Sequence, residues 1–463
     1  MDDSNVKSNS GQLHHHFSHY NFHHNAVHST GPFACLNPTT RYSLLPSPST
    51  STGSLSSTPS PPPPDAASSP PPPTPHHHHA AVYNVWRSRD NRKGRHSVLV
   101  HPSAILHKTA SAIADRNGGG DQHGGGGITH PPPTDTLAGA RRGIVKMATR
   151  YPLWDISYDV AVVFTLGSVV WVINGCFVWL PLAAPWTEFT GEVETGGGVT
   201  AFLGATIFEF GSVLLMLEAV NENRSDCFGW ALEEAVRGRH LHSTDENCCR
   251  HHHRLRHTLL PSISSSSGST GTNSTPREKR RWSWWPTTHE LTSHYLRDVG
   301  FLACLSQMIG ATIFWIAGFT GLPPIYDALP TTSVTNGIYW LPQVVGGTGF
   351  IVSSILFMIE VQERWYLPAP WMLGWHIGLW NLVGAIGFTL CGALGFGVGG
   401  QNGDAVEYAV TLSTFVGSWA FLIGSIIQWF ESLDKYTILV GTARLPLSLL
   451  SSSSSKGTGV EKV

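Results

Sequence analysis

The chain has 463 residues, of which 41% are hydrophobic and 13% are charged, with a net charge of -2. This balance gives no electrostatic sign of a nucleic-acid partner, and we expect none. The averages combine two unlike parts, because residues 1–140 are rich in Ser, Pro, His and Gly, whereas residues 155–431 hold long apolar runs. The distribution of charge along the chain is therefore more informative than its sum.

Residues 1–140 are predicted to be a disordered cytosolic region. Runs such as SPPPPDAASSPPPPTPHHHH at 60–79 favour extended polyproline II and cannot build a core. The stretch 82–116 is less extreme and carries five basic residues between positions 87 and 95. It has two interpretations, a solvated basic segment or a contact with a protein partner or anionic lipid. The basic residues are Arg87, Arg89, Arg92, Lys93 and Arg95.

Six apolar stretches follow, each close to the roughly 20 residues that a helix needs to cross a bilayer. They are too long for strands and do not alternate between polar and apolar residues. The predicted fold class is therefore an all-α membrane protein whose main partner is the lipid bilayer. The stretches are 159–181, 199–220, 299–321, 341–361, 374–397 and 408–430.

The six helices are expected to form three parallel helical hairpins. The hairpins occupy 151–220, 298–362 and 371–431. A basic, His- and Ser-rich loop at 221–297, predicted to be largely disordered, separates the first two, and a tail at 432–463 ends the chain. The oligomeric state stays open.

Lys and Arg residues predict the orientation. They precede the first helix, fill the loop 221–297, and follow the fourth and sixth helices, whereas the three other loops contain none. Because cytosolic loops carry the excess of Lys and Arg, both termini are expected in the cytosol. The disordered tails there could bind cytosolic proteins; the sequence does not identify which membrane is crossed.

A repeat links the six helices. Each carries Gly, an aromatic residue four positions later, and Gly or Ser after four more, and GATIF occurs at both 204 and 310. Positions i, i+4 and i+8 form one ridge, where small residues allow a neighbouring helix to approach closely. The small residues are Gly167 and Gly175, Gly204 and Ser212, Gly310 and Gly318, Gly346 and Ser354, Gly384 and Gly392, and Gly417 and Ser425.

The second helix of each hairpin also ends on a glutamate. Glu218, Glu360 and Glu431 each follow two small residues at intervals of seven, which places them on the packed face of the helix. This glycine-rich two-helix unit resembles the YrhK-like membrane domain, and the whole resembles uncharacterised fungal multi-pass membrane proteins built from it. The resemblance covers about 155–431 without the loop, and it implies an architecture but no activity.

The three terminal glutamates admit two interpretations. Glu360 has Arg364 and Glu431 has Lys435 at i+4, which favours salt bridges at the cytosolic rim. Alternatively, the three carboxylates converge and form a cation or proton site.

Glu209 is the acid deepest inside an apolar run, so it is a candidate for ion or proton binding. Asn174 of the neighbouring helix lies at comparable depth. The two could form a structural hydrogen-bonded clamp instead, with Glu209 protonated.

No catalytic motif, metal-ligand pattern or cofactor motif stands out. The segment HLHSTDENCCRHHHRLRH at 240–257 lacks the ordered spacing of a zinc site, and we expect no metal there. The predicted function is a non-enzymatic structural or scaffolding membrane protein. The alternative is an ion- or proton-coupled small-solute transporter that uses Glu209 and the three terminal glutamates, and a membrane enzyme is disfavoured.

Overall fold

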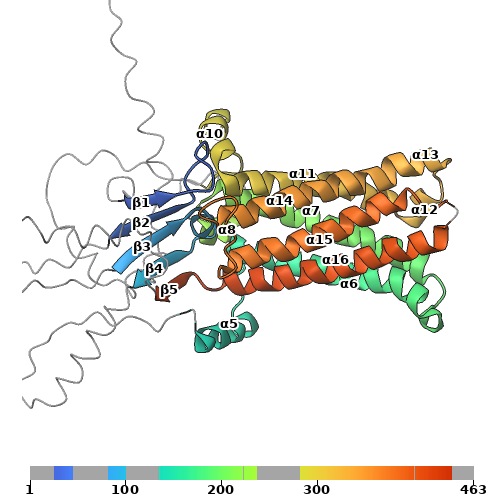
Figure 1. Ribbon diagram of the computed structural model, residues 1–463, viewed down its shortest axis with the longest axis horizontal. Helices are drawn as coiled ribbons and strands as arrows, with labels where there is room; N and C mark the ends of the chain where they lie inside the picture. Colours follow the sequence, from blue (N-terminus) through green and yellow to red (C-terminus); the bar gives the residue numbers. More distant parts are fainter. Residues whose placement is uncertain are drawn as a thin grey trace, which may run out of the picture.

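The structure is a computed structural model that describes residues 26–44, 82–100, 134, 136–222, 224–236, 282–400 and 402–440. In it, six helices are long and apolar enough to cross a membrane, which makes the chain a multi-pass membrane protein. They lie alongside one another as one elongated bundle (Figure 1). The helices are α6 (Ile156–Ala183), α7 (Gly198–Val220), α11 (Val299–Thr320), α14 (Leu341–Glu360), α15 (Leu373–Gly395) and α16 (Gly403–Ser432).

The six helices form a closed ring in chain order. Each packs against its neighbours in the sequence, and α16 packs against α6 to close the ring. The pairs predicted as hairpins are adjacent, but so are α7 with α11 and α14 with α15. The ring therefore does not single out three separate hairpins.

Aromatic side chains fill the middle of the ring. The aromatic residue of each repeat motif points to this centre, where Trp171 contacts Phe388 with ring centroids 4.7 Å apart and Phe388 contacts Phe421 at 5.3 Å. The cluster is nearly excluded from solvent, so it both packs and blocks the axis of the ring. Its members are Trp171, Phe208, Phe314, Phe350, Phe388 and Phe421.

The small residues of the motif let these rings fit. A Cβ on Gly204 would lie 2.7 Å from the Trp171 ring, and one on Gly384 would lie 2.7 Å from Phe421. At Gly346 the backbone itself is close, because a Cβ there would lie 2.6 Å from the Gly310 carbonyl oxygen. Ser212 and Ser354 donate their hydroxyls to carbonyls one turn earlier, so their polar atoms need no other partner.

A five-stranded sheet lies at one end of the ring, which we call the sheet end (Figure 1). The strand order is β1-β2-β3-β4-β5, antiparallel from β1 to β4, with β5 parallel to β4. Its first four strands precede the bundle, and the last follows α16 directly. The strands are β1 (Ala26–Thr30), β2 (Thr40–Leu44), β3 (Val82–Arg87), β4 (His96–Val100) and β5 (Tyr436–Val440).

The expectation of disorder throughout 1–140 is wrong for 26–44 and 82–100. VYNVWR and HSVLV are β-branched and aromatic stretches that form a strand pair, and Val85, Leu99 and Tyr42 build a small apolar core between strands. The polyproline and His-rich runs that suggested disorder lie outside the described residues.

Short helices complete both ends of the ring. α10 begins with the expected capping box of Thr287 and Glu290. Including α10, the short helices at the sheet end are α5 (Leu137–Thr149), η3 (Ser225–Cys227), α8 (Phe228–Val236), α10 (Thr288–Ser293) and η4 (Tyr295–Arg297). Those at the opposite end are η1 (Pro185–Thr187), η2 (Glu192–Gly197), α12 (Pro323–Tyr326), α13 (Thr332–Thr335) and η5 (Asn336–Trp340).

Candidate functional site

A basic hairpin tip is inserted into the sheet end of the ring. β3 and β4 are joined by α3 (Ser88–Arg92) and a tight turn, and we call residues 88–95 the basic tip. The turn needs Gly94, whose φ of 61° is a left-handed conformation that side chains disfavour. The tip closes on itself because the Arg95 amide donates to the Asp90 carbonyl.

Two arginines of the basic tip form buried salt bridges with two of the terminal glutamates. Arg89 donates to both carboxylate oxygens of Glu431, at 3.2 and 2.7 Å. Arg92 donates to both oxygens of Glu360, at 2.8 and 3.0 Å. All four side chains are at least 95% buried. Such bidentate arginine–carboxylate pairs are strong and geometrically specific.

The third glutamate, Glu218, joins the same cluster but forms no side-chain hydrogen bond to any residue that the structure describes. Its carboxylate lies 3.9 Å from both Arg92 Nε and Lys93 Nζ, and Lys93 Nζ lies 3.7 Å from Glu431. Arg92 thus links Glu360 to Glu218, and Lys93 links Glu218 to Glu431. The three terminal glutamates do converge, and the basic tip lies between them.

A second set of contacts holds the tip in shape. Arg95 bridges Asp90 at 2.9 Å and Glu431 at 3.0 Å, and Ser97 donates to Asp90. Ser88 donates to Asp298, the N-cap residue of α11, and to Glu360. The cluster therefore pairs four cations of the tip with Asp90 and the three glutamates, so the buried charge is close to balanced.

The environment shifts the ionisation of the tip. Burial is the largest influence and lowers the pKa of Arg92, but Glu360, Cys304 and Glu218 together outweigh it, and the pKa is raised well above its ordinary value. Burial lowers the pKa of Lys93, and Glu218 and Glu431 offset only part of this. Burial raises the pKa of Asp90, but Arg95 and Arg87 reverse the effect and the pKa is lowered.

The rim salt bridges expected from the sequence are wrong in their partners. Glu360 pairs with Arg92 rather than Arg364, whose guanidinium instead donates to the Tyr366 hydroxyl at 2.7 Å. Lys435 pairs with Asp155 rather than Glu431. Arg364 is exposed, whereas Lys435 donates to the Lys93 carbonyl of the basic tip, so neither side chain is placed to neutralise its i−4 glutamate.

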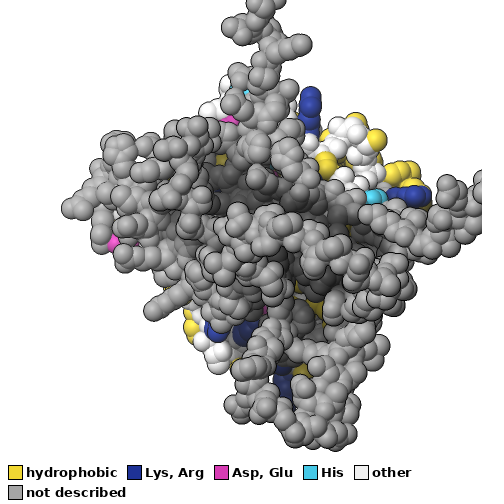
Figure 2. All heavy atoms as spheres, turned by 90° about the vertical axis from the view of Figure 1, so that its left-hand side faces the viewer, with side chains coloured by type: hydrophobic (Ala, Val, Ile, Leu, Met, Phe, Trp, Pro, Cys, Tyr) yellow, Lys and Arg dark blue, Asp and Glu magenta, His cyan; other side chains and the backbone are white. Residues whose placement is uncertain are grey.

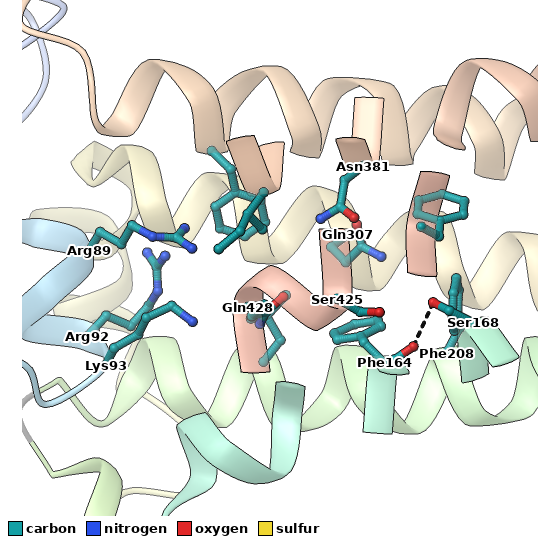
Figure 3. A pocket seen from close by; sticks show the side chains of 14 residues that line it. Arg89, Arg92, Lys93, Phe164, Ser168, Phe208, Gln307, Asn381, Ser425 and Gln428 are labelled. Carbon is teal, nitrogen blue, oxygen red and sulfur yellow. Dashed lines mark hydrogen bonds between the residues drawn. The ribbon is translucent and has the colours of Figure 1, made fainter. Parts of the chain in front are cut away.

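A central cavity lies between the basic tip and the aromatic cluster (Figure 3). Its volume of about 40 Å³ is enough for about three water molecules. All six helices of the ring contribute to its lining. Besides Arg89, Arg92 and Lys93, the lining consists of Phe164, Ser168, Phe208, Leu215, Gln307, Phe357, Ile377, Asn381, Phe421, Ser425 and Gln428.

The expected clamp between Glu209 and Asn174 is not formed. Glu209 accepts from the Thr312 hydroxyl of α11 at 2.9 Å, on the outer side of the ring. Asn174 donates to the Gly197 carbonyl at 2.7 Å and to Thr200 at 3.0 Å. The two residues are at comparable depth in the sequence pattern but bond to different neighbours, because α6 turns Asn174 towards the irregular start of α7.

The basic tip is what sequence reasoning missed. The sequence shows Arg89, Arg92 and Lys93 as a basic run, interpreted as solvated or as a partner or lipid contact, and the terminal glutamates were expected to pair with residues at i+4. Matching the two sets required knowing that β3 and β4 form a hairpin. The His-rich segment 240–257 lies outside the described residues, and within the described ranges no group of three or more His, Cys, Asp and Glu side chains is placed to hold a metal ion.

Seen from the sheet end, Lys and Arg side chains are visible at several places on the face of the molecule (Figure 2). No family model matches the chain, and no curated protein or solved structure matches it. What the site does must therefore be argued from its own geometry.

Proposed function

We propose that the chain is a non-enzymatic structural membrane protein. In this proposal the five-stranded sheet is a cytosolic cap, and the basic tip fixes that cap to the six-helix ring. The observation that carries this proposal is the pairing of Arg89 with Glu431 and of Arg92 with Glu360, all of them buried. The cap joins segments from both ends of the chain, since β4 pairs with β5. A fixed cap of this kind suits a scaffold that presents a constant surface to cytosolic proteins.

The cytosolic location of the cap rests on charge. The loops at the opposite end, 184–197, 321–340 and 396–402, contain no Lys or Arg, whereas the basic segments lie at the sheet end. The positive-inside tendency then orients the sheet end to the cytosol.

We also propose that the ring arose from a repeated two-helix unit of the YrhK-like kind, in a fungal membrane protein. The support is that one aromatic residue from each of the six motifs meets in a single cluster. The three glutamates that end alternate helices meet the same tip.

The scaffold proposal is tested by cross-linking in native membranes. Proteins that cross-link to the cap of the wild type should be lost in Arg92→Glu, which brings a third carboxylate to Glu360 and Glu218 and should release the tip. Arg364→Glu, at an exposed site, is the matched control and should keep them. Identical cross-links in wild type and Arg92→Glu would count against a cap-dependent scaffold.

The second candidate is an ion- or proton-coupled transporter, and the central cavity favours it because all six helices line that space. In proteoliposomes the scaffold should show no flux across a panel of ions and protons. Flux that disappears in folded Glu209→Gln protein would replace the scaffold proposal with the transporter.

A further inference from the structure

The charged side chains that line the central cavity are all cations. The lining includes the cations Arg89, Arg92 and Lys93 and no carboxylate, because the glutamates that pair with these cations do not reach the cavity. In Figure 3 Arg89 and Lys93 extend from the tip towards the side of the cavity where Gln307, Asn381 and Gln428 lie, and the Arg92 guanidinium lies between them. A low-dielectric space bounded by cations on one side favours negative charge.

Lys93 has hydrogen-bonding capacity left over. Lys93 is 1% exposed, and its buried ammonium forms no hydrogen bond within the described part of the chain. The nearest carboxylate oxygens, at 3.7 and 3.9 Å, are beyond hydrogen-bond distance. An ammonium has three donors, and leaving them unused in a buried place is costly, so the site calls for an acceptor.

Three amides complete the donor set. Gln307, Asn381 and Gln428 come from α11, α15 and α16, line the cavity, and form no side-chain hydrogen bond to other described residues. Their NH₂ groups can therefore turn to a ligand. The serines differ, because Ser168 and Ser425 already donate to backbone carbonyls of their own helices.

We propose that the central cavity binds a small monovalent inorganic anion, of the size of chloride or nitrate, between the Lys93 ammonium and the amides of Gln307, Asn381 and Gln428. A cation would face three positive side chains at this position. Phe208 and Phe421 of the aromatic cluster form the end of the cavity away from the tip. The anion site does not depend on the scaffold proposal, since a static protein can hold a structural anion.

The test uses the full chain purified in detergent, in gluconate buffer at constant ionic strength, because gluconate is too large for the cavity. Nitrate replaces gluconate stepwise while the thermal unfolding midpoint is recorded. A saturable rise is expected for the wild type, from which the apparent Kd follows. Lys93→Met and Gln307→Leu should each weaken that Kd by at least about tenfold.

Gln343→Leu is the matched control, because Gln343 is also a buried amide in the ring but lies outside the cavity. It should keep the wild-type Kd. No saturable rise in the wild type, showing a cavity that holds only water, overturns the proposal. Wild-type affinity in Gln307→Leu overturns it as well, and this variant decides the matter if Lys93→Met does not fold.

Discussion

Single side chains of the basic tip carry the largest share of the expected stability effects. Arg89 is a clear case, because its Nε and Nη2 both donate to Glu431 and neither partner reaches solvent. Removing one member of a buried pair leaves the other charged and unsolvated. An intact buried ion pair adds little net stability, but removing one of its two charged side chains is strongly destabilising.

Arg89→Met should therefore lower the free energy of unfolding by about 3–5 kcal/mol. Chemical or thermal unfolding of the purified protein measures it. Arg364→Met serves as the control, since Arg364 is exposed and its guanidinium donates to the Tyr366 hydroxyl, and it should leave the free energy of unfolding nearly unchanged. Equal, small effects in both variants would mean that Arg89 is not buried against Glu431.

Asp90 gives the expected pH dependence at this scale. Its pKa is lower in the folded chain than its ordinary value of about 3.9. The folded state thus favours the ionised form, which adds stability above pH of about 4, and this contribution is lost as pH falls through the folded-state pKa. Unfolding of wild type and Asp90→Asn should differ most near neutral pH and converge in acid. A constant difference across that range would contradict the shift.

At the scale of elements, the close contacts between helices decide where side chains are tolerated. Gly346 lies against the Gly310 backbone, and a Cβ there would lie 2.6 Å from a carbonyl oxygen that cannot move aside alone. Gly337, in η5 at the opposite end of the ring, has no atom within 4 Å of the position that its own Cβ would take. Gly346, within α14, therefore contacts a neighbouring helix closely, whereas Gly337, which precedes α14, has open space around it.

Gly346→Ala should cost about 1–3 kcal/mol because overpacking separates α11 from α14. Gly337→Ala should be neutral. Thermal unfolding midpoints of the two variants, measured side by side, check the difference. A neutral Gly346→Ala would mean that the two helices are farther apart than described.

The helices are also the part of the fold that the sequence predicted best. Length and apolar composition place all six. The expected ends lie within about three residues of those observed, except that α16 begins at Gly403, earlier than the expected start at 408. The motif identified the packed face because small residues at i, i+4 and i+8 can only serve a close neighbour. The motif did not predict that the six aromatic residues meet at the centre of the ring. A ridge of small residues identifies the packed face of a helix but not the helix that packs against it.

The sheet and the site could not be predicted in the same way. β1 to β4 come from two short stretches separated by about 37 residues of low-complexity sequence, and β5 follows more than 300 residues later. Local patterns do not encode such pairings. Their spacing identified the three terminal glutamates as one set. The Arg and Lys residues that pair with them belong to the hairpin of β3 and β4, which is distant in the sequence, so the sequence did not predict this pairing.

At the scale of the whole molecule, the chain is a ring with both its first and last described strands at one end. If the charge distribution orients it, the sheet end faces the cytosol. An epitope inserted after Gly337 should be protected from protease in sealed cytosol-side-out vesicles, whereas an N-terminal epitope should be digested. Digestion of both epitopes in intact vesicles, or protection of both, would contradict this orientation.

The central claim is that the basic tip holds the cap to the ring through its ion pairs. A double-mutant cycle on Arg92 and Glu360 tests it most directly, with Arg92→Met, Glu360→Leu and the combined variant compared by free energy of unfolding. Because the two side chains share two hydrogen bonds in a buried place, we expect a coupling of about 2–3 kcal/mol, with the double variant less destabilised than the sum of the singles. Additive effects within about 0.5 kcal/mol would contradict it.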